Sequence, residues 1–223
     1  MHRRQTIGKF AVLTLSAAVF LTILCIAVPA GAFIGDEPAK YKINIELYEE
    51  FYQLMVDNFT NAKFEGVAKQ TINGAYTESK YSAYSKDLDY KRIDATAEGV
   101  SVSHVTTPEQ VWYYYEKWNY VIYYKNKKNV ARFNSRVYFD SVKDDGKITK
   151  SVSDDQTTYQ LVDYNYNIRQ TFIFDSATKL LKLQIVEPEV GDKTETSYKG
   201  WEKVKIPKDI FTFPSRASAK CLD

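Results

Sequence analysis

After residue 59 the sequence is built from short runs of β-branched and aromatic residues, separated by turn-forming residues. Most of the connections are short enough to form hairpins, so consecutive runs are expected to pair as antiparallel strands. The runs alternate, for example with Leu181, Leu183 and Ile185 on one face and Lys182 and Gln184 on the other. The pattern predicts a large antiparallel sheet with one oily face and one largely polar face. Up to eleven strands are expected, at residues 64–72, 76–85, 89–95, 100–106, 111–115, 120–125, 157–164, 167–175, 180–187, 194–204 and 211–213, with a short helix within 129–142.

One long helix is predicted ahead of these strands, at residues 43–58. Leu47, Phe51, Leu54 and Met55 recur at helical spacing on one side of it, and acidic residues occupy the opposite side. The apolar stripe must be covered, and the most economical cover is a sheet that wraps around the helix. The expected fold class is therefore mainly β (α+β): a curved antiparallel half-barrel of about 10–11 strands around an N-terminal amphipathic helix.

An uncharged run of 19 residues, Phe10–Val28, follows three basic residues near the N-terminus. This arrangement is typical of a secretory signal peptide or of a signal anchor. Its length favours an anchor, because a cleaved signal usually has an apolar run of about 7–15 residues and a spanning helix needs about 20. The small residues Ala30, Gly31 and Ala32 also fit a cleavage site, so both interpretations stay open. By the positive-inside rule, the chain after this run is expected to lie outside the cytoplasm.

The rest of the chain reads as a single exported domain. Residues 1–35 are interpreted as the targeting segment, residues 36–41 as a linker and residues 42–223 as one domain. After residue 32 the chain carries 27 basic and 28 acidic residues, so no nucleic-acid partner is expected. The two cysteines, Cys25 and Cys221, exclude a disulfide framework. A lipoprotein signal places a small residue before its modified cysteine; because Leu24 stands there, Cys25 is interpreted as an apolar residue of the targeting segment.

The sequence contains few groups suited to catalysis. His104 is the only histidine outside the targeting segment, so a nucleophile–histidine pair would require it, and a zinc site would need further ligands. It is interpreted as a structural strand residue. The adjacent carboxylates at residues 144–145 and 154–155 lack the spacing of a calcium loop, and neighbours on a strand point to opposite faces. We therefore expect no enzyme activity, no metal and no cofactor.

The tract from Trp112 to Tyr124 (WYYYEKWNYVIYY) is rich in aromatic residues on both faces of a predicted hairpin. Residues 112 and 114 point one way and residues 113 and 115 the other. One face can join the core, and the other needs a lid, a ligand, a partner or cross-strand aromatic pairing. The candidate ligand- or partner-binding residues are Trp112, Tyr113, Tyr114, Tyr115, Trp118, Phe172, Phe174, Leu183 and Ile185.

Three stretches of the chain resemble the LolA-like superfamily of half-barrel carrier proteins. Leu47–Lys69 is similar to that family's opening helix and first strand, and Val105–Tyr115 is similar to a hairpin with a Trp and an aromatic residue. Thr171–Phe213 is similar to its closing strands, with Ile206–Pro214 (IPKDIFTFP) as the most specific motif. The resemblance implies an open half-barrel with helices as a lid over an apolar cavity. It also implies extracytoplasmic carriage of acylated lipoproteins, or lipid binding, sensing or protein docking.

The predicted anchor departs from a carrier that shuttles between membranes, and it favours a second resemblance, to the GerS group of spore-germination proteins. That resemblance implies a membrane-associated sporulation or germination factor that acts through a partner protein such as a cell-wall amidase. The alternative is a carrier that binds a lipid or acyl chain in the half-barrel. The free edges of an open sheet also allow a homodimer. The expected location is the outer side of the cytoplasmic membrane, or outside the cell if the signal is cleaved.

Overall fold

The computed structural model describes residues 43–72, 75–97, 99–127, 130, 135–189 and 191–222. The predicted targeting segment and linker lie outside these residues. Twelve strands of the described part form one sheet, in the order β12-β6-β5-β4-β3-β2-β1-β11-β10-β9-β8-β7. Their bounds are β1 Ala62–Ile72, β2 Ala75–Ser85, β3 Lys91–Ala97, β4 Val100–Thr106, β5 Val111–Tyr115, β6 Tyr120–Tyr124, β7 Gly146–Val152, β8 Gln156–Asp163, β9 Ile168–Asp175, β10 Leu181–Pro188, β11 Thr194–Lys203 and β12 Ser218–Cys221.

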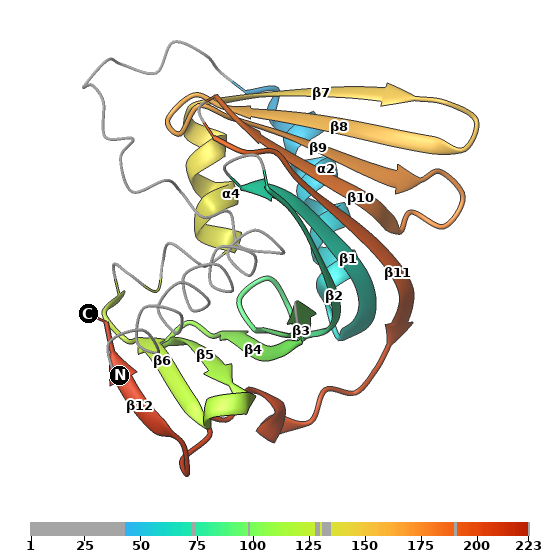
Figure 1. Ribbon diagram of the computed structural model, residues 1–223. Coiled ribbons are helices and arrows are strands. Elements are labelled where there is room, and N and C mark those ends of the chain that lie inside the picture. The colour runs from blue at the N-terminus through green and yellow to red at the C-terminus, as the bar shows by residue number, and fades with distance from the viewer. Residues whose placement is uncertain are drawn as a thin grey trace.

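The sheet curves around helix α2 (Ile45–Phe59), as Figure 1 shows. Every strand pair is antiparallel except β12 with β6, which is parallel. The predicted half-barrel around an N-terminal amphipathic helix is thus confirmed. The sheet has two strands, β7 and β12, that the sequence pattern did not predict. The predicted strand at residues 211–213 is wrong, because a short 3-10 helix, η2 (Lys208–Phe211), and unpaired chain occupy that stretch.

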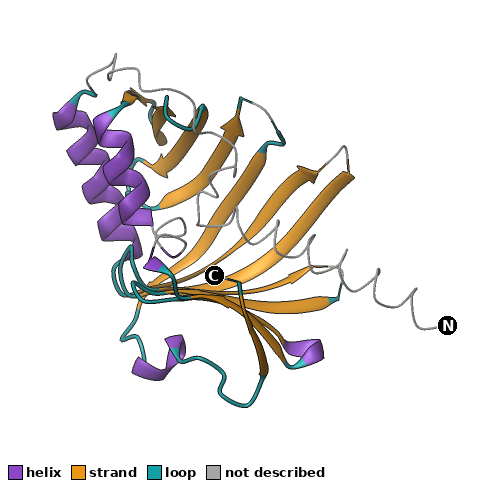
Figure 2. Cartoon of the chain, turned by 90° about the vertical axis from the view of Figure 1, so that its left-hand side faces the viewer, coloured by secondary structure: helices purple, strands orange, loops and turns teal. Residues whose placement is uncertain are grey.

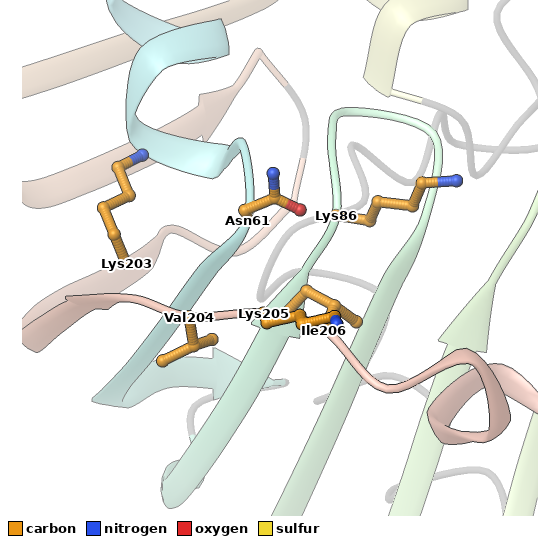
Figure 3. Close-up of a pocket in the computed structure, with 6 residues that line it drawn as sticks. All are labelled: Asn61, Lys86, Lys203, Val204, Lys205 and Ile206. Carbon is orange, nitrogen blue, oxygen red and sulfur yellow. The ribbon is translucent and has the colours of Figure 1, made fainter.

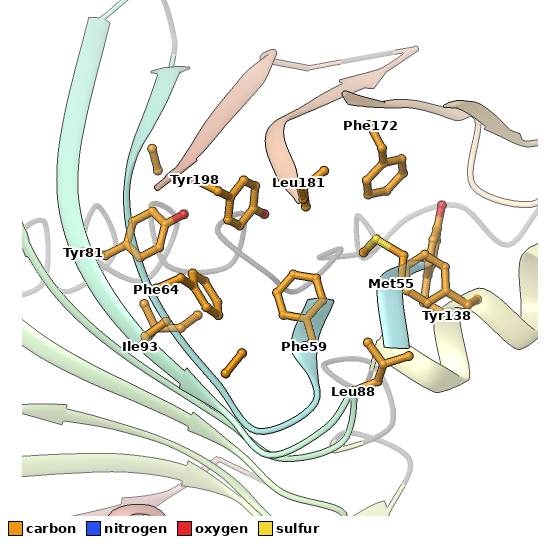
Figure 4. Close-up of a cluster of buried hydrophobic side chains, with 14 of the residues drawn as sticks. Met55, Phe59, Phe64, Tyr81, Leu88, Ile93, Tyr138, Phe172, Leu181 and Tyr198 are labelled. Atoms are coloured by element: carbon orange, nitrogen blue, oxygen red, sulfur yellow. The ribbon is translucent and has the colours of Figure 1, made fainter. Parts of the chain in front are cut away.

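Helix α2 begins at an Asn cap and buries one side against the sheet. The Asn44 side chain accepts a hydrogen bond from the Leu47 N–H at 3.1 Å, which satisfies one of the free donors of the first turn. The Phe51 ring lies 4.8 Å from that of Phe172 and 5.4 Å from that of Tyr159. Figure 4 shows aromatic rings of the helix and the sheet meeting in one cluster. The buried residues of the helix are Tyr48, Phe51, Met55, Asn58 and Phe59, whereas Leu47 and Leu54 are half-buried.

A second helix, α4 (Ser135–Asp144), lies beside α2 at one end of the half-barrel (Figure 2). It buries Phe139, whose ring meets that of Phe51 edge-on at 5.7 Å. The Tyr48 hydroxyl donates to the Phe139 carbonyl at 2.6 Å, so a hydrogen bond joins the two helices. The position of α4 agrees with the short helix expected within residues 129–142, which ends two residues later than predicted.

Strand β1 comes close to its neighbours at Gly66. A Cβ atom there would overlap the Ser197 carbonyl oxygen and the Tyr81 hydroxyl. The missing side chain lets the Tyr81 ring cross over β1 and donate to the Ser197 carbonyl at 3.0 Å. An aromatic residue covering a strand glycine is a known way to stabilise a strongly curved sheet.

Residues 204–217, which we call the C-terminal strap, cross the outer, convex face of the sheet. Phe213 contacts Trp112 and Tyr123, with ring centroids 6.1 and 5.4 Å away. Val105 and Val121 complete this small second core. The strap leads to β12, which adds a parallel edge strand to β6.

The faces of β10 differ from the predicted alternation. Leu181 is buried in the concave core, but a register shift follows it, so that Gln184 becomes the next buried residue. Leu183 and Ile185 are half-buried on the convex face. The prediction that all three apolar residues share a face is therefore wrong, because a bulge reverses the side to which the following residues point.

Candidate functional site

The aromatic tract contributes to both faces of the sheet, as its alternation predicts. Tyr113 and Tyr115 lie on the concave face and are buried in the main core. Burial raises the pKa of Tyr115 to about 12, so this hydroxyl stays neutral. Trp118, in the 3-10 helix η1 (Glu116–Trp118), is half-buried and lies 5.8 Å from the Tyr115 ring.

The convex face carries Trp112 and Tyr114. Trp112 is 2% exposed beneath the C-terminal strap, so the cover that the sequence requires on this face is supplied here by the chain itself. Tyr114 is half-buried beside it and donates from its hydroxyl to the Asn119 side-chain oxygen at 3.2 Å. The tract is therefore divided between two separate cores.

The remaining candidates also fall on two faces. Phe172 and Phe174 are fully buried around Phe51, where they form the core, and Leu183 and Ile185 lie outside. The structure does not bring the nine candidate residues together into one constellation. A binding role for any of them remains a prediction.

His104 is sealed inside the sheet and is 1% exposed. Its ring stacks on Tyr113 with centroids 4.4 Å apart and planes 3° apart, and its Nε2 lies 3.3 Å from the Thr106 hydroxyl. Burial lowers the pKa of His104 to about 3, and the charge of Lys91 acts in the same direction. The imidazole is therefore neutral across the physiological range and has no access to a substrate in solvent.

A buried chain of polar side chains crosses the concave face, and the sequence reasoning did not find it. The Gln170 amide donates to the Tyr138 hydroxyl at 2.8 Å, the Gln184 amide donates to the Gln170 oxygen at 2.9 Å, and the Tyr198 hydroxyl donates to the Gln184 oxygen at 2.8 Å. All four residues are buried. We call them the amide relay. The available signal was a Gln at a core-facing position of two neighbouring strands, which the bulge in β10 concealed.

Asp163, at the end of β8, is a fully buried carboxylate near Tyr138 of helix α4. Its Oδ1 accepts the N–H groups of Asn165 and Tyr166, at 2.9 and 3.2 Å, and so forms the following turn. Burial raises the pKa of Asp163 to about 6, although the two backbone bonds and Tyr138 act against this shift. Asp163 is therefore a buried group whose ionisation falls near physiological pH.

A cleft of about 430 Å³ lies where α2 passes into β1 (Figure 3). Lys86, Lys203 and Lys205 line it together with Asn61. Lys203 is already engaged, because its ammonium donates to the carbonyls of Asp57 and Thr60 at the end of α2. That contact caps the negative end of the helix, so the cleft is first of all a structural junction.

The described residues contain no group of three or more potential metal ligands. Within the same part of the chain, no helix is long and apolar enough to cross a membrane. The apolar run Phe10–Val28 lies outside the residues that the structure describes.

No protein-family model matches the sequence, and no curated protein matches it. Among solved structures, an uncharacterized conserved protein from Thermus thermophilus has a TM-score of 0.51 at 11% identity, over 78% of this chain and 98% of that one. A LolA superfamily protein from Nitrosomonas europaea has a TM-score of 0.43 at 10% identity, over 78% and 100% of the two chains. The MucA/MucB complex from Pseudomonas aeruginosa has a TM-score of 0.44 at 7% identity, over 77% and 62%. At these identities the likeness to the Thermus protein is one of fold alone.

Proposed function

We propose that this chain is a non-enzymatic, extracytoplasmic binding or adaptor protein. We further propose that its N-terminal segment holds it at the membrane. In this role it serves sporulation or germination through a partner protein such as a cell-wall amidase, as the resemblance to the GerS group implies. The observation that carries the proposal is the free edge of β7, a surface suited to docking another protein.

Among the strands that the structure describes, β7 is the last of the sheet and pairs only with β8. Along its outer edge, backbone N–H and C=O groups have no strand partner in the described part of the chain. Val152, at the end of this strand, is 66% exposed. An unpaired edge with an exposed apolar residue can accept a strand from a partner, with main-chain hydrogen bonds giving affinity.

The test is co-purification with tagged full-length protein from sporulating cells. We expect a cell-wall amidase to be recovered, and we expect Val152→Asp to lose it because a carboxylate would be buried in the added contact. Ser218→Asp, an exposed change on the opposite edge strand β12, is the matched control and should retain the partner. Recovery of no cell-wall enzyme, or equal loss in both variants, contradicts the proposal.

The second candidate function is a carrier for a lipid or acyl chain. One observation favours it: the concave face of β1–β3 carries the small buried residues Ala68, Ala83 and Ala95, with Tyr81 filling the space at Gly66 between them. Small side chains on the inside of a curved sheet leave room for an occupant. Native mass spectrometry of the purified protein distinguishes the two functions, since a carrier retains a lipid of defined mass and an adaptor does not.

A further inference from the structure

A second surface lies on the convex face, away from the β7 edge. The ligand inferred for it is independent of the proposed function. The strand register places Ser82, Asp94, Ser103 and Tyr114 directly opposite one another on β2, β3, β4 and β5. Their side chains form a single row, because paired residues of neighbouring strands point to the same face. The row lies in a cleft of about 420 Å³, within the range of small-molecule sites. We call this cleft the convex groove.

The carboxylate of Asp94 is held in one orientation. The Arg92 Nε donates to both of its oxygens at 3.0 Å, and the Ser103 hydroxyl donates to Oδ1 at 2.5 Å. Arg92 is itself fixed, because its Nη1 donates at 3.1 Å to the Ile210 carbonyl of the C-terminal strap. The two side chains remain about one-third exposed, at 30% for Arg92 and 35% for Asp94. A preoriented, accessible carboxylate is a recognition element for hydroxyl or amide donors.

The rest of the lining defines the chemistry of the ligand. Thr96 and Ser101 are paired on β3 and β4 and hydrogen-bond to each other through hydroxyls 3.2 Å apart on the floor of the groove. Tyr114 contributes a half-buried aromatic ring. Glu116 adds a second carboxylate, and Arg92 is the only basic residue among the described residues of the lining. Anionic ligands are therefore disfavoured, and the shallow polar floor offers little to an apolar one. Hydroxyls, an oriented carboxylate and a ring face together suit a neutral molecule that has both hydroxyl groups and a C–H face.

We propose that the convex groove binds a neutral oligosaccharide, with Asp94 accepting from ring hydroxyls and Tyr114 stacking against a sugar ring. The Arg92–Asp94–Ser103 cluster then acts as a preformed polar clamp, and Tyr114 sets the position of the ring. Two sources share this chemistry: glycans built from N-acetylated amino sugars and those built from unmodified glucose.

Isothermal titration of the full-length chain with tri-N-acetylchitotriose and, in parallel, with maltotriose tests the proposal. The detergent must be zwitterionic and without a sugar headgroup, since a maltoside would compete. Saturable binding of at least one trisaccharide is expected, and the preferred one identifies the source. Asp94→Asn should weaken binding about tenfold or more, since a hydrogen bond to a charged group is lost.

Tyr114→Ala should weaken binding similarly, whereas Tyr114→Phe keeps the ring and should bind as wild type does. Tyr76→Ala is the matched control, because Tyr76 is a 62% exposed tyrosine on β2 of the same sheet and does not line the groove. Unfolding curves of each variant establish that the fold is intact. The proposal is overturned if neither trisaccharide binds saturably, if Tyr76→Ala weakens binding as much as Tyr114→Ala, or if an acidic peptide binds in their place.

Discussion

Replacing Asp163 by Asn should stabilise the protein at neutral pH and leave it unchanged in acid. The carboxyl is fully buried, and its pKa is raised from 3.8 to about 6. Between these two values the folded state holds a proton that the unfolded state has released. Stability from this group is therefore fully present below about pH 3.8 and is lost as the pH rises through about 6.

The magnitude follows from the shift. A difference of about two pKa units corresponds to about 3 kcal/mol, since each unit is worth about 1.4 kcal/mol. An Asn at this position keeps an Oδ1 acceptor for the N–H groups of Asn165 and Tyr166, so the turn survives. We therefore expect Asp163→Asn to gain between about 1 and 3 kcal/mol of unfolding free energy at pH 7.5, and almost nothing at pH 4.

Urea denaturation followed by tryptophan fluorescence, repeated from pH 4 to pH 8, measures this difference. The pKa values of two other acids shift downward, opposite to that of Asp163: Lys150 lowers the pKa of Glu50, and Lys182 lowers the pKa of Asp175. Both acids therefore make stability rise with pH. The difference between variant and wild type isolates Asp163 from them. Asp154→Asn, which changes an exposed carboxylate in the turn before β8, is the control and should alter the free energy of unfolding by less than about 0.5 kcal/mol. A constant offset across the pH range, or a variant that is less stable at pH 7.5, would refute the reasoning.

Three further changes test the packing. Phe213→Ala should lower the free energy of unfolding by about 1–2 kcal/mol, which is less than for a fully buried Phe. It should also shift tryptophan fluorescence emission to longer wavelength, because Trp112 loses its cover. Gln184→Leu should lower the free energy of unfolding, measured by urea denaturation, by about 2–4 kcal/mol, because Gln170 and Tyr198 lose their hydrogen-bond partner. Its control is Gln160→Leu on the outer face of β8, which should change that free energy by no more than about 0.5 kcal/mol. Gly66→Ala should lower the melting temperature markedly, because its Cβ would overlap the Ser197 carbonyl; a melting temperature equal to wild type would contradict the close approach of these strands.

Local pattern was sufficient for most of the fold. Strands β4 and β5 begin and end at the predicted residues, because their runs of β-branched and aromatic residues are bounded by clear turn residues. The stripe of α2 was found from helical spacing alone, and Phe51 and Met55 are indeed buried. Its centre differs by a fraction of a turn, since Tyr48 and Phe59 are buried where Leu47 and Leu54 are not.

The errors have a common origin in contacts that are distant in the sequence. β12 is a polar strand of four residues, and only its parallel pairing with β6 defines it. Phe211 and Phe213 alternate as strand residues do, but Phe213 covers Trp112 and Tyr123, and Phe211 contacts Tyr90. The bulge after Leu181 likewise changes the faces of Leu183 and Gln184 without any local signal in composition. For this reason the candidate site residues could be chosen by type but not by face.

The difference between the two faces bears on where a ligand is recognised. On the concave side, the amide relay is polar but satisfied from within, since each of its three hydrogen bonds joins two members of the relay. An acyl chain laid against these amides gains no polar contact, and one placed near Phe51 must displace rings that already fill the space. On the convex side, the Asp94 carboxylate is oriented by Arg92 and Ser103 yet remains open to solvent. Oriented groups that remain solvated are the ones that can exchange water for a ligand at little cost in reorganisation. The distribution of satisfied and accessible polar groups thus favours recognition on the outside of this half-barrel over storage within it.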